Sequence, residues 1–111
     1  METRSVINIV ATQCQPEVEE KFNKWYDETH IPMLLKCSGL KSATRYKLLS
    51  ESEDYPKYLA IYEFESREAF KAYQTSPELA EALEEIKDTW KQNGFETKWR
   101  VQYELIKTWQ K

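Results

Sequence analysis

Glycine, cysteine and histidine are scarce in this sequence. Of its 111 residues, two are glycine, four are proline, two are cysteine and one is histidine. So little glycine and proline leaves little room for flexible linkers, and no low-complexity tract or convincing internal repeat is visible. Because chains of this length commonly form one unit with one core, a single domain spanning residues 1–111 is expected.

The few histidines and cysteines do not form a recognisable metal site. Cys14 and Cys37 lack the close spacing of zinc ligands, and His30 is the one histidine. No metal site is therefore expected. Two cysteines are also a weak disulfide framework, which favours free thiols and a reducing, cytoplasmic setting.

Long apolar runs and an excess of one charge are also missing. No apolar run approaches the roughly 18 residues of a membrane span, and the first apolar stretch lacks signal-peptide chemistry, so no membrane association is expected. The net charge is −3, from 16 basic and 19 acidic residues that are interleaved. This balance of charge argues against a nucleic-acid partner, because binding one would need a basic surface on one side of the protein.

The composition is that of a folded protein, with 41% hydrophobic and 14% aromatic residues. Segments rich in β-branched and aromatic residues predict strands over residues 5–14, 40–49, 57–65 and 96–109. The last of these alternates apolar and polar residues, as a strand with two different faces does.

Two helical regions separate these strands. The first opens at Pro16 and is expected to break near His30, because Pro32 cannot donate a helical hydrogen bond; one or two more turns then lead to Gly39. The second region starts at an N-cap serine, restarts at a Ser-Pro-Glu sequence and stops at an Asn-Gly sequence, at residues 66, 76–78 and 93–94.

The order β-α-β-β-α-β predicts a ferredoxin-like α+β fold. Two right-handed crossovers joined by a hairpin give a four-stranded antiparallel sheet with both helical regions on one face. Trp25 and Trp90 lie within the helical apolar stripes and are assigned to the core.

The other face of this sheet is also apolar. In the first strand, Ile7, Ile9 and Ala11 lie on one face, and Val6 and Val10 lie on the other. Soluble monomers seldom expose so large an apolar surface, so a homodimer with the sheets packed face to face is predicted. Such a dimer closes an α/β barrel and leaves space for a small-molecule ligand.

Polar and aromatic residues on these apolar strands are candidates for binding that ligand. For each polar residue, the alternative is an ion pair or hydrogen bond at a strand end or dimer seam, and for each aromatic residue it is a place in the core or interface. The candidates on the strands are Asn8, Arg45, Tyr46, Tyr62, Glu63, Trp99 and Tyr103.

The segment "WYDETHIP" at the end of the first helix contains a candidate catalytic group. Tyr26 and Asp27 precede His30 by four and three residues, so both side chains can reach the imidazole on a helix surface. A carboxylate and the carbonyl end of a helix both favour the charged imidazole, which could then move protons near neutral pH. The alternative is a histidine at the rim that caps the last helical carbonyls and does no chemistry.

This segment, followed by "GLKSATRYKL" and "YLAIYEFES", resembles the dimeric α/β-barrel superfamily, and most nearly its EthD-like branch. The resemblance implies a ferredoxin-like fold and a dimer formed through the sheets. It also implies activities such as those of cofactor-independent isomerases, cyclases, dehydratases and monooxygenases. Position for position, the proton-transfer role falls on His30, whereas Arg45 and Tyr46 lie in the strand that borders the pocket, without a defined role. Heme ligation by His30 is a less favoured alternative.

The leading hypothesis is an enzyme that acts, without a metal or organic cofactor, on a small carbonyl-bearing or lactone-like metabolite. His30 would transfer the proton, Asp27 would orient it, and Arg45 or Asn8 would stabilise negative charge on oxygen. The alternatives are a non-catalytic dimer that binds a small molecule or serves as an accessory subunit, and a structural dimer without a pocket.

Overall fold

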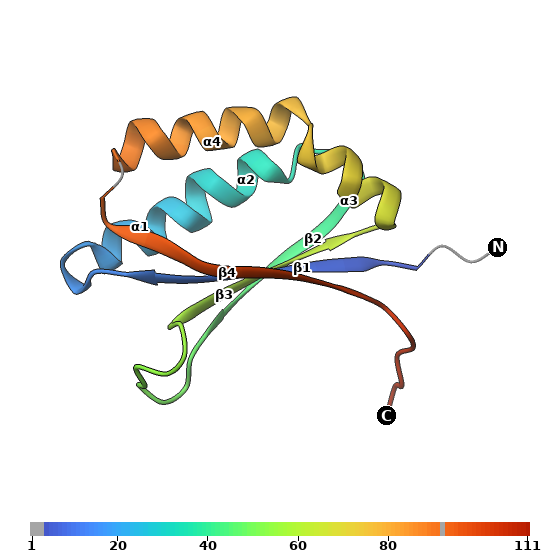
Figure 1. Ribbon diagram of the computed structural model, residues 1–111, viewed down its shortest axis with the longest axis horizontal. Coiled ribbons are helices and arrows are strands. Elements are labelled where there is room, and N and C mark those ends of the chain that lie inside the picture. The colour runs from blue at the N-terminus through green and yellow to red at the C-terminus, as the bar shows by residue number, and fades with distance from the viewer. Residues whose placement is uncertain (1–3, 92) are drawn as a thin grey trace.

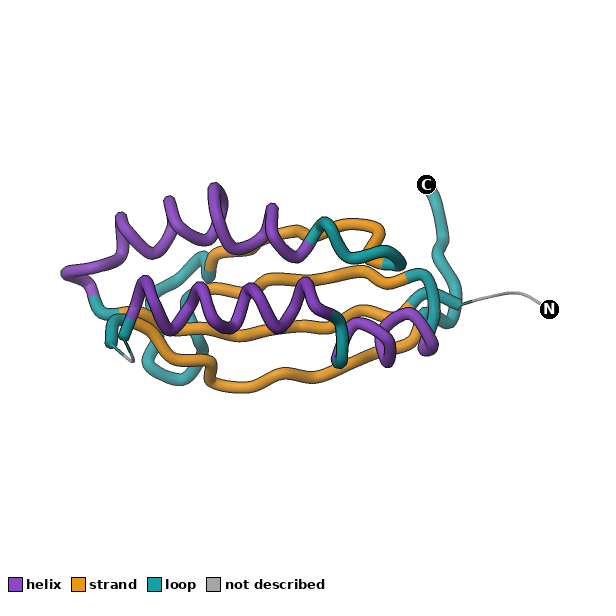
Figure 2. Tube along the Cα trace, turned by 90° about the horizontal axis from the view of Figure 1, so that it is seen from above, coloured by secondary structure: helices purple, strands orange, loops and turns teal. Residues whose placement is uncertain are grey.

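The computed structural model describes residues 4–91 and 93–111. Its strands form one antiparallel sheet in the order β2-β3-β1-β4, and helices cover one face of that sheet (Figures 1 and 2). The predicted ferredoxin-like α+β fold is confirmed. The strands are β1 (Val6–Cys14), β2 (Leu40–Lys47), β3 (Tyr58–Phe64) and β4 (Phe95–Glu104).

The two helical regions lie side by side over the sheet (Figure 2). The second contains α3 (Arg67–Gln74) and α4 (Pro77–Trp90), and the side chains of Ser66 and Ser76 cap them by accepting hydrogen bonds from backbone N–H groups three residues on. The first region runs through a 3-10 turn at Pro16–Val18, α1 (Glu19–Trp25), a π-helical turn at Tyr26–His30 and α2 (Ile31–Leu34).

The π-helical turn replaces the predicted break near His30. The chain stays helical through Pro32, and the N–H of Ile31 donates to the carbonyl of Tyr26, five residues back. Proline has no N–H to donate, and its ring collides with the carbonyl of the preceding turn in a regular α-helix. A single wider turn relieves both problems without ending the helix.

An aromatic core fills the space between helices and sheet. Phe22 is fully buried, and its ring lies 5.2–6.3 Å from those of Trp25, Trp90 and Phe95, centroid to centroid. Each such buried side chain contributes about 1.5–3 kcal/mol to stability. The assignment of Trp25 and Trp90 to the core is confirmed, since both are nearly inaccessible to solvent.

Strand β4 ends at Glu104, five residues before the predicted end. Its partner β1 begins at Val6, which pairs with Glu104, and one further bond joins the Leu105 N–H to the Ser5 carbonyl. Beyond that point no strand among the described residues pairs with the chain, and residues 105–111 leave the sheet on the side away from the helices (Figure 1).

The sheet face away from the helices, called the open face below, is covered by no helix or strand of the described residues (Figure 1). The alternation read from the sequence is confirmed, because Ile9 pairs with Ile61 and Val101 across this face. No helix in the described part of the chain is long and apolar enough to span a membrane. The open face carries Ile7, Ile9, Ala11, Leu59, Ile61, Glu63, Trp99, Val101 and Tyr103.

Candidate functional site

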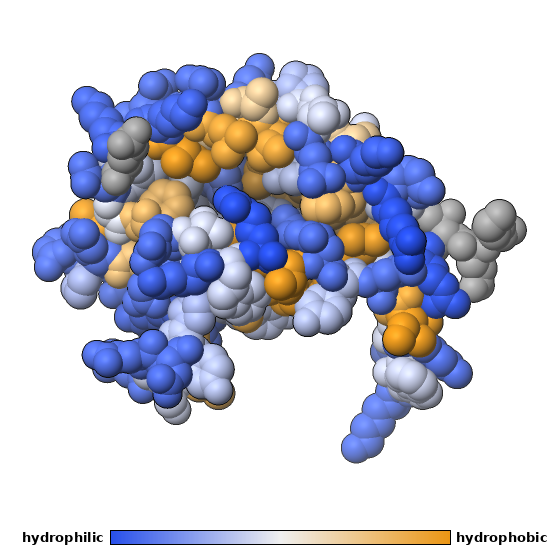
Figure 3. Space-filling model, in the orientation of Figure 1, coloured by the Kyte–Doolittle hydropathy of each residue, from blue (hydrophilic) through white to orange (hydrophobic). Residues whose placement is uncertain are grey.

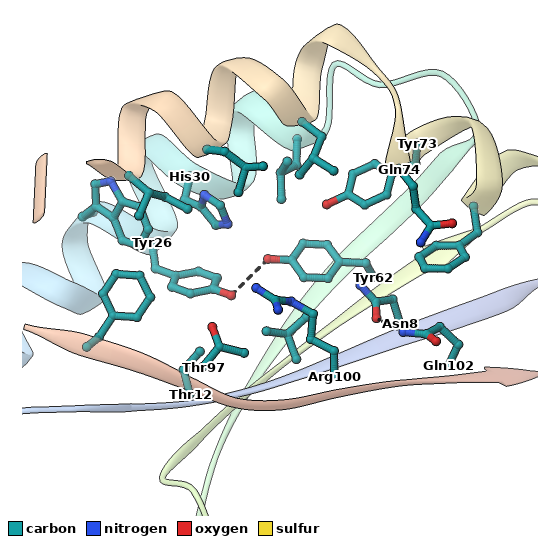
Figure 4. Close-up of a pocket in the computed structure, with 18 residues that line it drawn as sticks. Asn8, Thr12, Tyr26, His30, Tyr62, Tyr73, Gln74, Thr97, Arg100 and Gln102 are labelled. Carbon is teal, nitrogen blue, oxygen red and sulfur yellow. Dashed lines mark hydrogen bonds between the residues drawn. The ribbon is translucent and has the colours of Figure 1, made fainter. Parts of the chain in front are cut away.

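A cavity of about 440 Å³ lies between the sheet and the helices (Figure 4). Its floor comes from β1, β3 and β4, its far wall from α1, the π-helical turn and α2, and the rest from α3 and α4. Seen in the orientation of Figure 3, apolar side chains reach the surface around a hollow between α4 and the sheet. The volume is in the range of small-molecule pockets.

His30 points into this cavity from the π-helical turn (Figure 4). Its imidazole stacks on the Trp25 indole, with centroids 4.9 Å apart, and meets the Tyr26 ring edge-on at 5.0 Å. The residue is 8% exposed, and its buried Nδ1 has no hydrogen-bond partner among the described residues. A buried polar atom without a partner points to a bound water or ligand.

The imidazole is neutral at pH 7. Burial lowers the pKa of His30 from 6.5 to about 4, and the negative charge of Glu85 offsets part of that effect. The expectation from the sequence that the imidazole of His30 is charged is therefore wrong. Burial among aromatic neighbours lowers the pKa more than the helix end and the nearby carboxylate raise it, because a buried cation loses its hydration.

Asp27 does not orient His30. Its side chain is 60% exposed and its Oδ1 accepts a hydrogen bond from Nη1 of Arg45, at 2.8 Å. The expected contact assumed α-helical spacing, in which residues three apart share a face. A π-helical turn has more residues per turn, so His30 is turned toward the core while Asp27 stays at the surface.

Arg45 lies on the outer side of the first helical region. Besides Asp27 it binds the Asn23 side chain at 2.9 Å, and its guanidinium lies 4.6 Å from the Tyr26 ring centroid. It does not line the cavity that contains His30. The expectation that Arg45 stabilises charge beside His30 is therefore wrong: the ion pair with Asp27 holds it at the seam between α1 and β2.

Three tyrosines face the cavity with their hydroxyl groups. Tyr26 and Tyr62 share a hydrogen bond of 3.1 Å between their hydroxyls, and Tyr73 lies beyond them (Figure 4). Burial raises the pKa of Tyr26, raises that of Tyr62 well above 10, and raises that of Tyr73 to about 12. All three are protonated at neutral pH and can donate hydrogen bonds.

Strand β4 supplies a polar strip that the sequence reasoning missed. Thr97, Arg100 and Gln102 line the cavity, and the Gln102 side chain donates to Asn8 Oδ1 at 2.9 Å. The alternation in β4 was visible in the sequence, but only Trp99 and Tyr103 on its other side were taken as candidates. A register shift between the pairs of Ala11 and Thr12 also moves Thr97 onto the side of Arg100.

The candidate residues divide between the cavity and the other surfaces. Asn8, Tyr26, His30 and Tyr62 line the cavity, as expected of ligand-binding residues. Tyr46, Glu63, Trp99 and Tyr103 lie on the open face instead, because they pair across the strands with that side of the sheet. They cannot reach a ligand held beside His30 within one chain.

Within residues 4–91 and 93–111, no group of three or more histidine, cysteine, aspartate or glutamate side chains is placed to hold a metal ion. Cys14 and Cys37 are free thiols. The ionisable side chains of the cavity are His30, the three tyrosines and Arg100, which suits proton transfer and binding of an anion.

The sheet topology and the cavity above it define a protein with the ferredoxin-like α+β fold, which similar solved structures share. Residues 5–102 match the family described as a domain of unknown function, DUF4286, and the chain belongs to that family. No curated protein matches the sequence.

Solved structures with the same fold cover nearly the whole chain at low sequence identity. An ethyl tert-butyl ether D (EthD) family protein from Bacillus halodurans has a TM-score of 0.68 and 14% identity, covering 94% of this chain and 100% of that one. A dimeric ferredoxin-like protein of unknown function from Thermobifida fusca has a TM-score of 0.56 and 17% identity, and the match covers 95% of this chain and 92% of that one. SnoaB, a cofactor-independent oxygenase from Streptomyces nogalater, has a TM-score of 0.60 and 12% identity, and the match covers 97% of each chain.

Proposed function

We propose that this protein is an enzyme that moves a proton on a small carbonyl-bearing molecule, without a metal or organic cofactor. The observation that carries the proposal is the buried imidazole of His30, which faces a cavity of about 440 Å³ with an unpartnered nitrogen. The similar fold of SnoaB, a cofactor-independent oxygenase, supports this class of chemistry.

In the proposed step, neutral His30 accepts a proton from the carbon next to the substrate carbonyl. The electron pair of the broken C–H bond moves onto the carbonyl oxygen and forms an enolate. Arg100 and the tyrosine hydroxyls that face the cavity stabilise the new negative charge. The negative charge of the enolate also stabilises the imidazolium beside it, which compensates for the low basicity that burial gives His30. Return of the proton to another atom gives an isomer.

Deuterium exchange tests this step without knowledge of the final product. Small ketones, β-dicarbonyl compounds and lactones are incubated in D₂O with the protein, and loss of the α C–H signal is followed by proton NMR. The wild-type protein is expected to accelerate exchange in at least one compound. His30→Gln is expected to lower that rate by about a hundredfold or more, which is the usual contribution of a general base.

Asp27→Asn is the matched control, because Asp27 lies outside the cavity and should leave the rate unchanged. Melting temperatures establish that both variants remain folded. Equal exchange rates for wild type and His30→Gln would return His30 to a structural role.

A non-catalytic binding protein is the second candidate. The observation that favours it is the low pKa of His30, about 4, because burial makes the imidazole a weak base. In that case His30→Gln would retain saturable binding of a small molecule, and no compound would exchange faster with the protein than without it.

The open face supports a homodimer in which two sheets pack face to face. It is largely apolar, and Trp99 and Tyr103 on it are 43% and 61% exposed. Stable interfaces bury about 800 Å² on each partner, which is within the reach of a four-stranded sheet. The similar protein from Thermobifida fusca is described as dimeric, which supports the same arrangement here.

A further inference from the structure

The side chains that line the cavity carry one positive charge and no negative charge at neutral pH. Arg100 is the one cation, and no aspartate or glutamate lies among the lining residues. His30 is neutral, and the tyrosines keep their protons. The chain as a whole carries a net charge of −3, so the net charge of the cavity lining is opposite in sign to that of the protein.

Arg100 also differs from the other three arginines. Arg45 and Arg67 pair with the carboxylates of Asp27 and Glu104, and Arg4 donates to two backbone carbonyls near the C-terminus. For the guanidinium of Arg100, no ion pair or side-chain hydrogen bond is formed with the described residues. Its five donors are therefore available to a ligand.

The position of Arg100 directs these donors toward the tyrosines. The residue pairs with Val10 on the side of the sheet that faces the helices, and its side chain rises toward the Tyr26–Tyr62 hydroxyl pair (Figure 4). Burial raises the pKa of Tyr26 and Tyr73, and the positive charge of Arg100 opposes this in both. The guanidinium and the hydroxyls thus act on the same region of the cavity.

The remaining wall is apolar and partly aromatic. Leu79, Leu83 and Ile86 come from α4, and Trp25, Phe70 and Phe95 are among the lining rings. Such a wall favours a flat hydrocarbon body, because contact with it removes apolar surface from water.

We infer that the cavity binds small molecules that combine an apolar ring system with one anionic group, with the anion held by Arg100 and the rings against α4. A carboxylate, sulfonate or phenolate meets this description, since a guanidinium binds such groups through paired hydrogen bonds. This inference rests on the proposed function, which makes the cavity the ligand site, and it specifies the ligand class.

Two fluorescent probes with the same rings test the charge requirement. 1-Anilinonaphthalene-8-sulfonate carries a sulfonate, and N-phenyl-1-naphthylamine lacks it. The full chain without a histidine tag is titrated with each probe, and Kd is taken from the fluorescence increase. His30 is the only histidine, so the proton on Cε1 of its ring gives one NMR signal that reports whether a probe enters the cavity.

Arg100→Gln is expected to weaken sulfonate binding by about tenfold or more, which is the range for a hydrogen bond to a charged group. The same change should alter Kd for the neutral probe by less than about twofold. The Kd of Arg100→Lys for the sulfonate probe should lie between those of the wild type and Arg100→Gln, because lysine keeps the charge and loses the planar guanidinium. Lys98→Gln removes a cation from the same strand outside the cavity, and it should leave the Kd of both probes unchanged.

Each failure has a distinct signature. If both probes shift the His30 signal but Arg100→Gln changes neither Kd, the anionic ligand class is wrong and the cavity remains a binding site. If neither probe shifts the His30 signal in the wild-type protein, the cavity is not a ligand site, and the inference falls together with the proposed function.

Discussion

The imidazole of His30 lies on the indole of Trp25, with ring centroids 4.9 Å apart and planes inclined by 22°. Together with the edge-on contact to Tyr26, this stack fixes the imidazole plane without any hydrogen bond to the ring among the described residues. The chain therefore holds its one histidine by aromatic packing, where a carboxylate would be the usual orienting group.

The first prediction concerns the charges that act on His30. Glu85, whose carboxylate accepts a hydrogen bond from the Trp25 indole at 2.8 Å, raises the pKa of His30, while burial lowers it. Glu85→Gln should therefore lower the pKa of His30 further. Asp27→Asn should leave it unchanged, because Asp27 pairs with Arg45 at the surface.

An NMR titration of the single imidazole measures both effects. The wild-type signal is expected to titrate near pH 4. A shift in Asp27→Asn and none in Glu85→Gln would restore the pairing that the sequence suggested and contradict the structure.

The second prediction concerns the dependence of stability on pH. The pKa of His30 is lower in the folded chain than the value of 6.5 expected when unfolded, so between pH 6.5 and 4 the unfolded state binds the extra proton. Stability should therefore fall as the pH falls through this window, by about 2 kcal/mol between pH 7.5 and 5. His30→Gln should remove most of this decrease.

Urea unfolding at the two pH values measures the difference. Glu19 and Glu104 do not confuse it, because hydrogen bonds and ion pairs lower their pKa values below 4.5 and their contribution is lost only at lower pH. Equal pH dependence in wild type and His30→Gln would show that the imidazole is not desolvated.

The fold was predictable because its determinants are local and repeated. The strand alternation, the Ser66 and Ser76 caps and the order of elements each point to the same α+β sheet. The two faces of β1 were also assigned correctly, since side chains alternate strictly along a strand.

The site was less predictable because two irregularities decide it. The π-helical turn rotates His30 away from Asp27, and helical wheels drawn at α-helical spacing do not contain that rotation. The register shift in β4 places Thr97 beside Arg100 on the helix side, against simple alternation. Arg100 was not among the candidates, because a cavity beneath α4 depends on packing between distant elements.

The third prediction concerns the Tyr26–Tyr62 hydroxyl pair. Tyr26→Phe and Tyr62→Phe should each destabilise the protein by about 1 kcal/mol, because each leaves the other buried hydroxyl without this bond. In the double variant the two losses should not add, and the coupling should be about 0.5–1.5 kcal/mol. Tyr46→Phe, at a half-exposed tyrosine on the open face, should change stability by less than about 0.5 kcal/mol.

Urea unfolding of the four variants and the wild type completes the cycle. Strict additivity of the two single changes would mean that the hydroxyls do not bond to each other in solution, and that each is satisfied by water in the cavity.

The fourth prediction concerns the open face. Ile61 lies on the central strand β3, pairs with Ile9, and is half-buried in the single chain. If two copies pack through this face, Ile61→Glu places a carboxylate in the middle of the interface, where burying it without a partner is costly. Ala80→Glu adds the same charge to an exposed position of α4, on the helix side of the molecule, and serves as the control.

Sedimentation at micromolar concentration distinguishes the outcomes. The wild-type protein and Ala80→Glu are expected to sediment with the mass of two chains, and Ile61→Glu with the mass of one. The melting temperature of Ile61→Glu should then depend less on protein concentration than that of the wild type, since dissociation no longer accompanies unfolding. A wild-type protein with the mass of one chain would mean that water covers the apolar open face, and the sheet-to-sheet dimer would be wrong.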